Sequence, residues 1–169
     1  MSEPVHIVEA TTPDEIDAVR ALFGEYAAEL GWDISTGWIA DEIAGLPGPY
    51  APPRGSLMLA YAHGEPAGAL GLQPVPEPAR IPGTGAETAG ELKRMFVRPR
   101  FRGAGVGRAL AKRSEEEGRR LGYESLVLTT NAEMFPLAQG LYESLGYVEW
   151  RPYRDDMPYP DIRWMRLTL

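Results

Sequence analysis

Hydrophobic residues recur along the chain at two spacings: every second residue in some segments, and every third or fourth residue in others. Runs of the first kind, or continuous apolar runs, predict strands, because successive side chains of a strand point to opposite faces. They cover residues 5–9, 56–62, 67–75, 91–97, 125–130, 147–151 and 161–169. The second spacing predicts helices over 13–30, 34–46 and 105–121, and a short helix that begins near Pro136 and stops at Gly146.

The first helix carries the clearest start and stop signals. Thr12 and Glu15 match a capping box around Pro13, and proline suits the first helical position because the amide it lacks would be unpaired there. Gly31 is expected to end the helix. Its apolar stripe consists of Ile16, Val19, Leu22, Phe23, Tyr26 and Leu30.

The order of these elements is one strand, two helices, three strands, then helix, strand, helix and two strands. This order alone indicates an α/β or α+β protein. Residues 63–66 predict a hairpin turn, and the Pro/Gly-rich segments 46–55 and 76–89 predict loops. With 169 residues, no repeat and no linker, residues 1–169 are expected to form a single domain.

Composition narrows the function classes. The formal net charge of -7 argues against duplex nucleic acid as a partner and suits an amine substrate, although solubility alone accounts for it equally well. The chain has no cysteine, which excludes disulfides, thiolate metal sites and a cysteine nucleophile. It has neither a secretory signal pattern nor an apolar run near the roughly eighteen residues of a membrane helix. We therefore expect a cytoplasmic protein with no membrane partner.

The most informative stretch is Arg-Gly-Ala-Gly-Val-Gly-Arg at 102–108, between a predicted strand and a predicted helix. Its three glycines let the backbone approach a ligand closely, and the helix start offers unpaired N–H groups with the positive end of a dipole. This arrangement suits a phosphate or pyrophosphate. The nearby basic residues, which indicate an anionic ligand in an acidic protein, are Arg98, Arg100, Arg102 and Arg108.

Two common phosphate-binding motifs do not fit this stretch. A P-loop ends in Gly-Lys-Ser/Thr, but Arg108 follows Gly107 here. A dinucleotide fingerprint needs a third glycine at the position of Arg108 and a strand that ends directly before the first. The pattern that remains is Arg-x-x-Gly-x-Gly, carried by Arg102, Gly105 and Gly107.

Two segments resemble the GNAT family of N-acetyltransferases. Residues 91–99 followed by 102–110, Glu-Leu-Lys-Arg-Met-Phe-Val-Arg-Pro and Arg-Gly-Ala-Gly-Val-Gly-Arg-Ala-Leu, resemble its acetyl-CoA-binding motif. Residues 141–147, Leu-Tyr-Glu-Ser-Leu-Gly-Tyr, resemble its second signature. The resemblance implies an α+β fold with a mixed sheet of about seven strands flanked by four helices. It also implies transfer of acetyl from acetyl-CoA to a primary amine of a small molecule or protein.

The resemblance further implies which residues hold the cosubstrate. The pantetheine arm would pair with the strand backbone at Met95, Phe96 and Val97, where the strands 91–97 and 125–130 splay apart. A backbone N–H near Met95 or Phe96 would face the developing oxyanion. Asn131 is a further candidate for the arm, although the usual asparagine place, seven residues before Tyr142, holds Phe135. The diphosphate would bind the loop amides of Arg102, Gly103, Ala104, Gly105, Val106, Gly107 and Arg108.

Two side chains are candidates for proton transfer. Tyr142 is the expected general acid for the leaving thiolate. The alternative for this residue is an aromatic side chain at the margin of the core, without a catalytic role. Glu91 is the expected general base, acting directly or through water, and otherwise a solvated carboxylate at a strand end. Glu87 is a weaker substitute. His6 and His63 have no partner in sequence, and no His/Asp/Glu spacing indicates a metal.

The acceptor site is expected between the first two helices and the last hairpin. Its walls would be Trp32, Trp38 and Tyr50 on one side and Tyr153, Asp155, Asp156 and Tyr159 on the other. The same side chains also suit ordinary surface loops or a dimer contact, and dimers are frequent in the resembled family. Without a cysteine to carry the acyl group, direct attack in a ternary complex is expected. The alternatives are a non-catalytic acyl-CoA-binding or sensory module, and a transferase with another acyl group or an O-acceptor.

Overall fold

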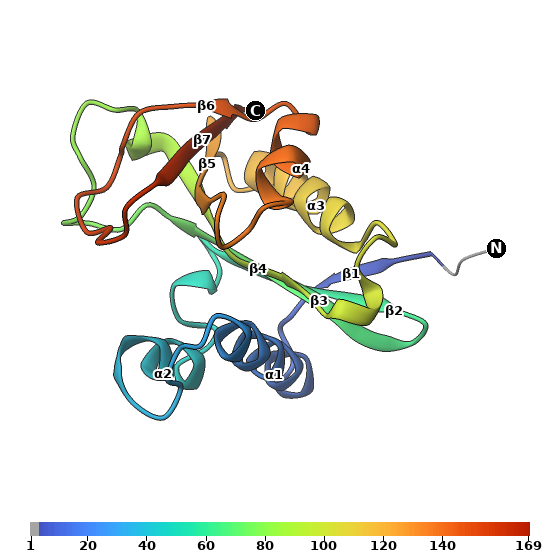
Figure 1. Ribbon diagram of the computed structural model, residues 1–169. Helices are drawn as coiled ribbons and strands as arrows, with labels where there is room; N and C mark the ends of the chain where they lie inside the picture. Colours follow the sequence, from blue (N-terminus) through green and yellow to red (C-terminus); the bar gives the residue numbers. More distant parts are fainter. Residues whose placement is uncertain (1–3) are drawn as a thin grey trace.

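The structure of the protein is a computed structural model that describes residues 4–169. Its elements lie in the predicted order (Figure 1). The strands are β1 (His6–Glu9), β2 (Ser56–Ala62), β3 (Glu65–Pro74), β4 (Ala89–Val97), β5 (Ser125–Asn131), β6 (Val148–Glu149) and β7 (Ile162–Thr168). The helices are α1 (Pro13–Glu29), α2 (Gly37–Ala44), α3 (Val106–Arg120) and α4 (Ala138–Ser144), with short 3-10 turns at Gly48–Tyr50, Ala86–Thr88 and Pro99–Phe101.

The seven strands form one mixed sheet in the order β1-β2-β3-β4-β5-β7-β6, and only β4 and β5 run parallel. Helices α1 and α2 lie on one face of the sheet, and α3 and α4 on the other (Figure 1). Alternate residues of β2 serve the two faces: Leu57 and Leu59 pack with α1, whereas Met58 and Ala60 pack with α3. The expected α+β fold, with a mixed sheet and four helices, is confirmed.

Local signals account for the ends of several elements. Thr12 and Glu15 form the predicted capping box at the start of α1, and Gly31, with φ of 72°, follows its end. The hairpin turn is tighter than predicted: His63 and Gly64 both adopt positive φ, which matches the twist of the flanking strands and lets β3 begin at Glu65.

Two predicted elements are shorter in the structure. The helix expected over 34–46 begins only at Gly37, because Asp33 accepts hydrogen bonds from the backbone and hydroxyl of Ser35 and holds a turn there. The strand expected over 147–151 is reduced to the two exposed residues of β6 at the edge of the sheet.

Strands β4 and β5 separate after a short contact. They pair only from Ala89 to Glu91 on β4, so the rest of that edge of β4 has no strand beside it. On the other edge, the pairing with β3 shifts register opposite Leu70, and Arg94 there has a φ of 60°. A non-glycine residue in this conformation is strained by about 1 kcal/mol or more. The opening lies in the middle of the sheet, with helices on both sides (Figure 1).

No helix within residues 4–169 combines the length and hydropathy needed to cross a membrane. The stretch tested above for a secretory signal begins at Met1, and its first three residues lie outside the described residues.

Candidate functional site

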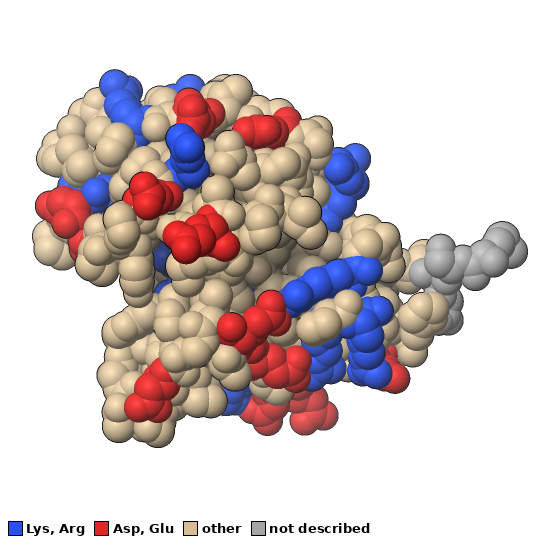
Figure 2. All heavy atoms as spheres, viewed as in Figure 1, with Lys and Arg blue, Asp and Glu red and all other residues tan. Residues whose placement is uncertain are grey.

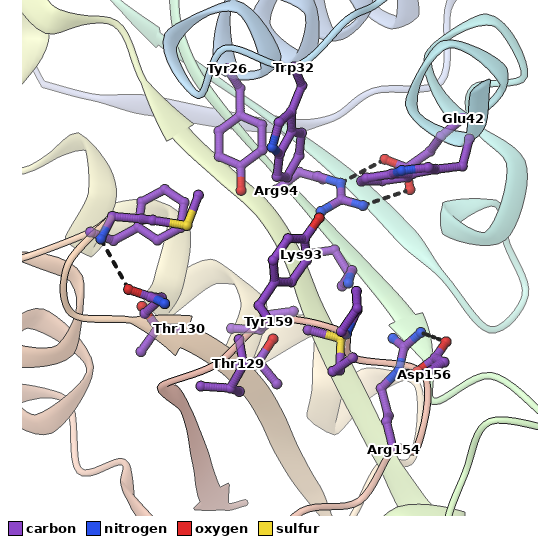
Figure 3. Close-up of a pocket in the computed structure, with 18 of the residues that line it drawn as sticks. Tyr26, Trp32, Glu42, Lys93, Arg94, Thr129, Thr130, Arg154, Asp156 and Tyr159 are labelled. Atoms are coloured by element: carbon purple, nitrogen blue, oxygen red, sulfur yellow. Dashed lines mark hydrogen bonds and ion pairs between the residues drawn. The ribbon is translucent and has the colours of Figure 1, made fainter. Parts of the chain in front are cut away.

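Two hollows meet at the opening between β4 and β5. We call the first the glycine groove: it has a volume of about 490 Å³ and is bounded by β4, the 102–108 loop and α4. We call the second the polar cavity: it has a volume of about 560 Å³ and is bounded by α1, α2, β4, β5 and the loop before β7 (Figure 3). A smaller space of about 70 Å³ lies between them, in the opening itself.

The glycine groove is built from bare backbone. Gly103 and Gly105 have φ of 79° and 84°, which L side chains rarely adopt, and a side chain at either would meet no protein atom. Gly105 caps α3, and no side chain hydrogen-bonds its first turn. The N–H groups that begin α3 are therefore available to an anion. This geometry fits a diphosphate.

Most residues expected to hold the cosubstrate line this groove. They are Met95, Phe96, Val97, Arg102, Gly103, Gly105, Val106, Gly107 and Arg108. Ala104 does not line it; it is exposed on the outside of the bend. Asn131 lies in the polar cavity instead, where its side-chain oxygen accepts from the amides of Glu133 and Met134. This turn places Phe135 beside the opening.

Most of the arginines expected to form a basic patch are paired with glutamates. Figure 2 shows acidic and basic side chains next to one another beside the central hollow. The ion pairs are Arg98–Glu25, Arg100–Glu65 and Arg102–Glu29. Arg108 instead donates to the Ser144 hydroxyl. Attraction of an anion therefore depends on the amides at the start of α3 more than on arginine charge.

Tyr142 lies beneath the opening. Its side chain, 6% exposed, lines the small space between β4 and β5, and its hydroxyl donates to the Met95 sulfur at 3.7 Å. Its ring meets that of Tyr147 edge-on at 5.3 Å between centroids. Burial raises the pKa of Tyr142, so the phenol stays protonated at neutral pH, as a proton donor must.

Tyr26 and Phe135 join the two hollows. Both line the glycine groove, the small space and the polar cavity, and their rings stack 6.1 Å apart and nearly parallel. Sequence reasoning missed them as site residues. Tyr26 falls on the apolar stripe of α1, which indicates a core residue, and Phe135 follows β5 in a segment without periodicity.

A stacked ion pair forms one wall of the polar cavity. Arg94 binds Glu42 through two hydrogen bonds, from Nε at 2.9 Å and from Nη2 at 3.2 Å. The guanidinium lies 5.7 Å from the ring of Trp32 and 5.0 Å from that of Trp38 (Figure 3). Arg94 reaches Glu42 of α2 from a backbone with a φ of 60°. The pair fixes α2 against β4.

Glu91 is a buried carboxylate, which contradicts the solvated alternative and leaves action through water as the remaining form of the expected general base. It is 1% exposed, so it is not a solvated carboxylate, and it does not line the polar cavity. One oxygen accepts from Gln73 at 2.9 Å and from Arg154 at 2.6 Å, and the other accepts from Tyr153 at 2.9 Å. With both oxygens engaged, Glu91 is not placed to take a proton directly from an amine. Its partners Gln73 and Arg154 do line the cavity.

This network also ties two loops together. Arg154 bridges Glu91 and Asp156, and the backbone of Ile81 donates to Tyr153 at 2.8 Å. The loop after β6 is thereby held to the loop after β3. Glu87, the weaker candidate base, accepts from the Gly83 amide in that second loop and does not line the cavity.

Replacing Glu91 by glutamine is expected to lower the free energy of unfolding by about 2 kcal/mol, because the charge-assisted bond to Arg154 is lost in a buried place. Urea unfolding measures the change. The control is Glu149→Gln, which removes the exposed ion pair with Arg163 and is expected to change stability by less than about 0.5 kcal/mol. A Glu91→Gln midpoint equal to that of the wild type would contradict the network's role.

The structure brings together some of the side chains that are expected to form the acceptor walls. Trp32, Trp38, Asp156 and Tyr159 line the polar cavity, whereas Tyr50, Tyr153 and Asp155 do not. Tyr50 is 1% exposed and packs against Gly71, where any side chain would collide with its ring. Tyr153 is buried on Glu91. The His63 ring stacks on Phe101, and no cluster of three or more potential metal ligands occurs among the residues described.

Comparisons with known proteins agree on one family. A family model described as "Acetyltransferase (GNAT) family" matches residues 19–147. A protein of Schizosaccharomyces pombe, named as an uncharacterised N-acetyltransferase, is 32% identical over 158 residues, which are 93% of this chain and 90% of that protein.

Solved structures share the fold at lower identity. The ribosomal-protein-alanine N-acetyltransferase of Brucella melitensis superposes with a TM-score of 0.72 at 20% identity, covering 97% of this chain and 99% of its own. The acetyltransferase yncA of Salmonella typhimurium, solved with its cofactor acetyl-CoA, gives 0.68 at 18% identity and covers 98% and 94%.

Proposed function

The chain belongs to the acetyltransferase (GNAT) family, and from that membership we propose that it transfers acetyl from acetyl-CoA to a primary amine of a small molecule or protein. The observation that supports this most is the meeting of two unlike hollows at the β4–β5 opening. The glycine groove suits a diphosphate and a pantetheine arm, and the polar cavity suits an acceptor. Their junction at Tyr26 and Phe135 is where a thioester and an amine can meet.

Each part of the donor has a complementary part of the groove. The amides at the start of α3 would take the diphosphate. The backbone of Met95, Phe96 and Val97 would pair with the pantetheine amides, since this edge of β4 has no neighbouring strand. The Val97 carbonyl already accepts from Arg102 Nε at 2.9 Å, which leaves the groups of Met95 and Phe96 for the arm.

The reaction can be written with few protein groups. A neutral amine nitrogen attacks the thioester carbonyl, the N–C bond forms, and the C–S bond breaks as the tetrahedral intermediate collapses. A backbone N–H near Met95 or Phe96 would stabilise the oxyanion. The departing sulfur takes the hydroxyl proton of Tyr142, and the amine loses its proton to water in the cavity. The Tyr142 phenolate then regains a proton from that water before the next turnover. Without cysteine in the chain, acyl transfer proceeds directly within the ternary complex.

The buried carboxylate of Glu91 has a positioning part in this proposal. It holds Arg154, which lines the polar cavity, and it reaches an acceptor only through that side chain or Gln73. Asn131 likewise acts through the turn that sets Phe135 at the junction.

Release of free thiol from acetyl-CoA, measured with a panel of primary amines, tests the proposal. Amine-dependent release that yields the N-acetylated product supports it. Calorimetry with CoA separates the main rival: a non-catalytic acyl-CoA-binding module would bind CoA and release no thiol with any amine. The same assay with longer acyl-CoAs as competitors tests the choice of acyl donor.

A further inference from the structure

Lys93 is the charged group of the polar cavity that has no partner. It lies partly buried on β4 and lines both this cavity and the small space at the opening. Within residues 4–169 its ammonium group makes no hydrogen bond or ion pair. The other two cations of the cavity are engaged: Arg94 with Glu42, and Arg154 with Glu91 and Asp156. Every acid that lines the cavity is thus paired with an arginine.

The surroundings of Lys93 explain why it stays unpaired. Its cross-strand neighbour on β3 is Gly71, which offers no side chain. Glu91, two residues earlier on β4, is already bound by three donors. Burial lowers the pKa of Lys93, Glu91 and Glu42 act to raise it, and Arg94 and Arg154 lower it further. A ligand that brought a negative charge would therefore gain a charge-assisted hydrogen bond here without breaking an internal one.

The mouth of the same cavity is apolar. Trp38, Met134 and Tyr159 are 54%, 39% and 41% exposed, and all three line the cavity. Side chains of this size are otherwise mostly buried in the described part of the chain. An exposed apolar rim around a cationic interior suits a ligand with an apolar body and an anionic group.

We propose that the acceptor is a free α-amino acid with an apolar side chain, whose carboxylate binds Lys93 and whose side chain lies against Trp38 and Tyr159. The inference rests on the proposed function and deepens it. Because Lys93 borders the small space as well as the cavity, a carboxylate on it keeps an adjacent α-amine close to the thioester position. A protein lysine, by contrast, would bring a cation and leave Lys93 without a counter-charge.

Matched acceptors test the carboxylate directly. We would compare kcat/KM for L-phenylalanine and L-phenylalaninamide with wild type, Lys93→Met and Lys93→Arg. Lys93→Met is expected to lower kcat/KM for the acid about 10- to 100-fold, mainly through KM, and to change that for the amide less than about threefold. Lys93→Arg should recover part of the loss. Lys112, the other lysine of the chain, is exposed on α3, and Lys112→Met is the control with no expected effect.

Each comparison is between wild type and variant with the same acceptor. The lower basicity of the amine in L-phenylalaninamide therefore does not affect the result. An equal loss with both acceptors would mean that Lys93 does not recognise the carboxylate, and would overturn the inference. If Lys93→Met leaves kcat/KM unchanged for both the acid and the amide, the inference is overturned as well. CoA calorimetry on Lys93→Met checks that the glycine groove is intact.

A readout without turnover separates this inference from the proposed function. An amine-reactive reagent followed by peptide mass spectrometry reports both lysines at once. L-phenylalanine should slow the labelling of Lys93 at least about threefold and leave that of Lys112 unchanged, whereas L-phenylalaninamide should protect neither. If no amine yields thiol release but Lys93 is protected, the transferase proposal fails and the carboxylate site stands. If thiol is released and Lys93 is not protected, the transferase proposal stands and the carboxylate site is overturned.

Discussion

Replacing Gly105 by valine is expected to weaken CoA binding at least about 100-fold. Two effects combine. Valine is disfavoured at a φ of 84°, so the bend before α3 shifts, and its side chain would point into the open space of the groove. Loss of two amide hydrogen bonds to a charged diphosphate amounts to about 3 kcal/mol, a factor of about 100 or more. Calorimetric titration of CoA into the folded variant measures it.

The opposite end of the same helix provides the control. Gly122 follows α3, also has a φ of 84°, and likewise has no protein atom near the position of a Cβ. Gly122→Val therefore brings the same backbone strain at a distance from the groove. It should lower stability by a similar amount and leave CoA affinity unchanged. A normal isotherm for Gly105→Val would show that the bend does not hold the diphosphate.

The Tyr142→Phe variant is expected to lower kcat about 100-fold while the Kd for acetyl-CoA changes less than about twofold. The variant removes only the hydroxyl, whose proton would go to the leaving thiolate in the proposed reaction. Packing should be nearly unaffected, because the ring still meets Tyr147 and the sulfur of Met95 accepts only a long, weak hydrogen bond. Initial rates with saturating acetyl-CoA, beside a binding titration, separate the two quantities.

Tyr147→Phe is the matched control, since this tyrosine is also buried and lines none of the three spaces. Its kcat is expected to stay near that of the wild type. The pH profile gives a second check. Burial raises the pKa of Tyr142 above 10.0, so its deprotonation should not reduce kcat below about pH 10. Unchanged turnover in Tyr142→Phe would exclude the hydroxyl as the proton donor.

The parts of the fold that could be predicted were those with a local sequence signal or a family resemblance. The capping box and stripe of α1, the glycine bend before α3 and the order of elements along the chain follow from local chemistry and from family resemblance, and the structure agrees with them. The splay of β4 from β5, which the resemblance implied, is also present. In contrast, the start of α2 and the length of β6 depended on a local turn and on edge position, which hydrophobic spacing does not report.

The site was predictable only where backbone forms it. Side-chain partners far apart in sequence decided the rest. Arg102 pairs with Glu29, 73 residues away, and Glu91 pairs with Arg154, 63 residues away. No pattern within either segment indicates these partners. Lys93 and Tyr26 were missed as site residues because each fits an ordinary strand or helix pattern. Only the tertiary arrangement brings them to a cavity.

The small space at the strand opening bears on the size of the acyl group in the proposed reaction. At about 70 Å³ it is much smaller than either hollow, and Leu70, Leu92 and Leu128 are among the residues that line it. A two-carbon group fits such a volume, and the stacked rings of Tyr26 and Phe135 border the space into which a longer acyl chain would extend. In the proposed reaction, trimming either ring is therefore expected to let the enzyme accept longer acyl-CoA thioesters.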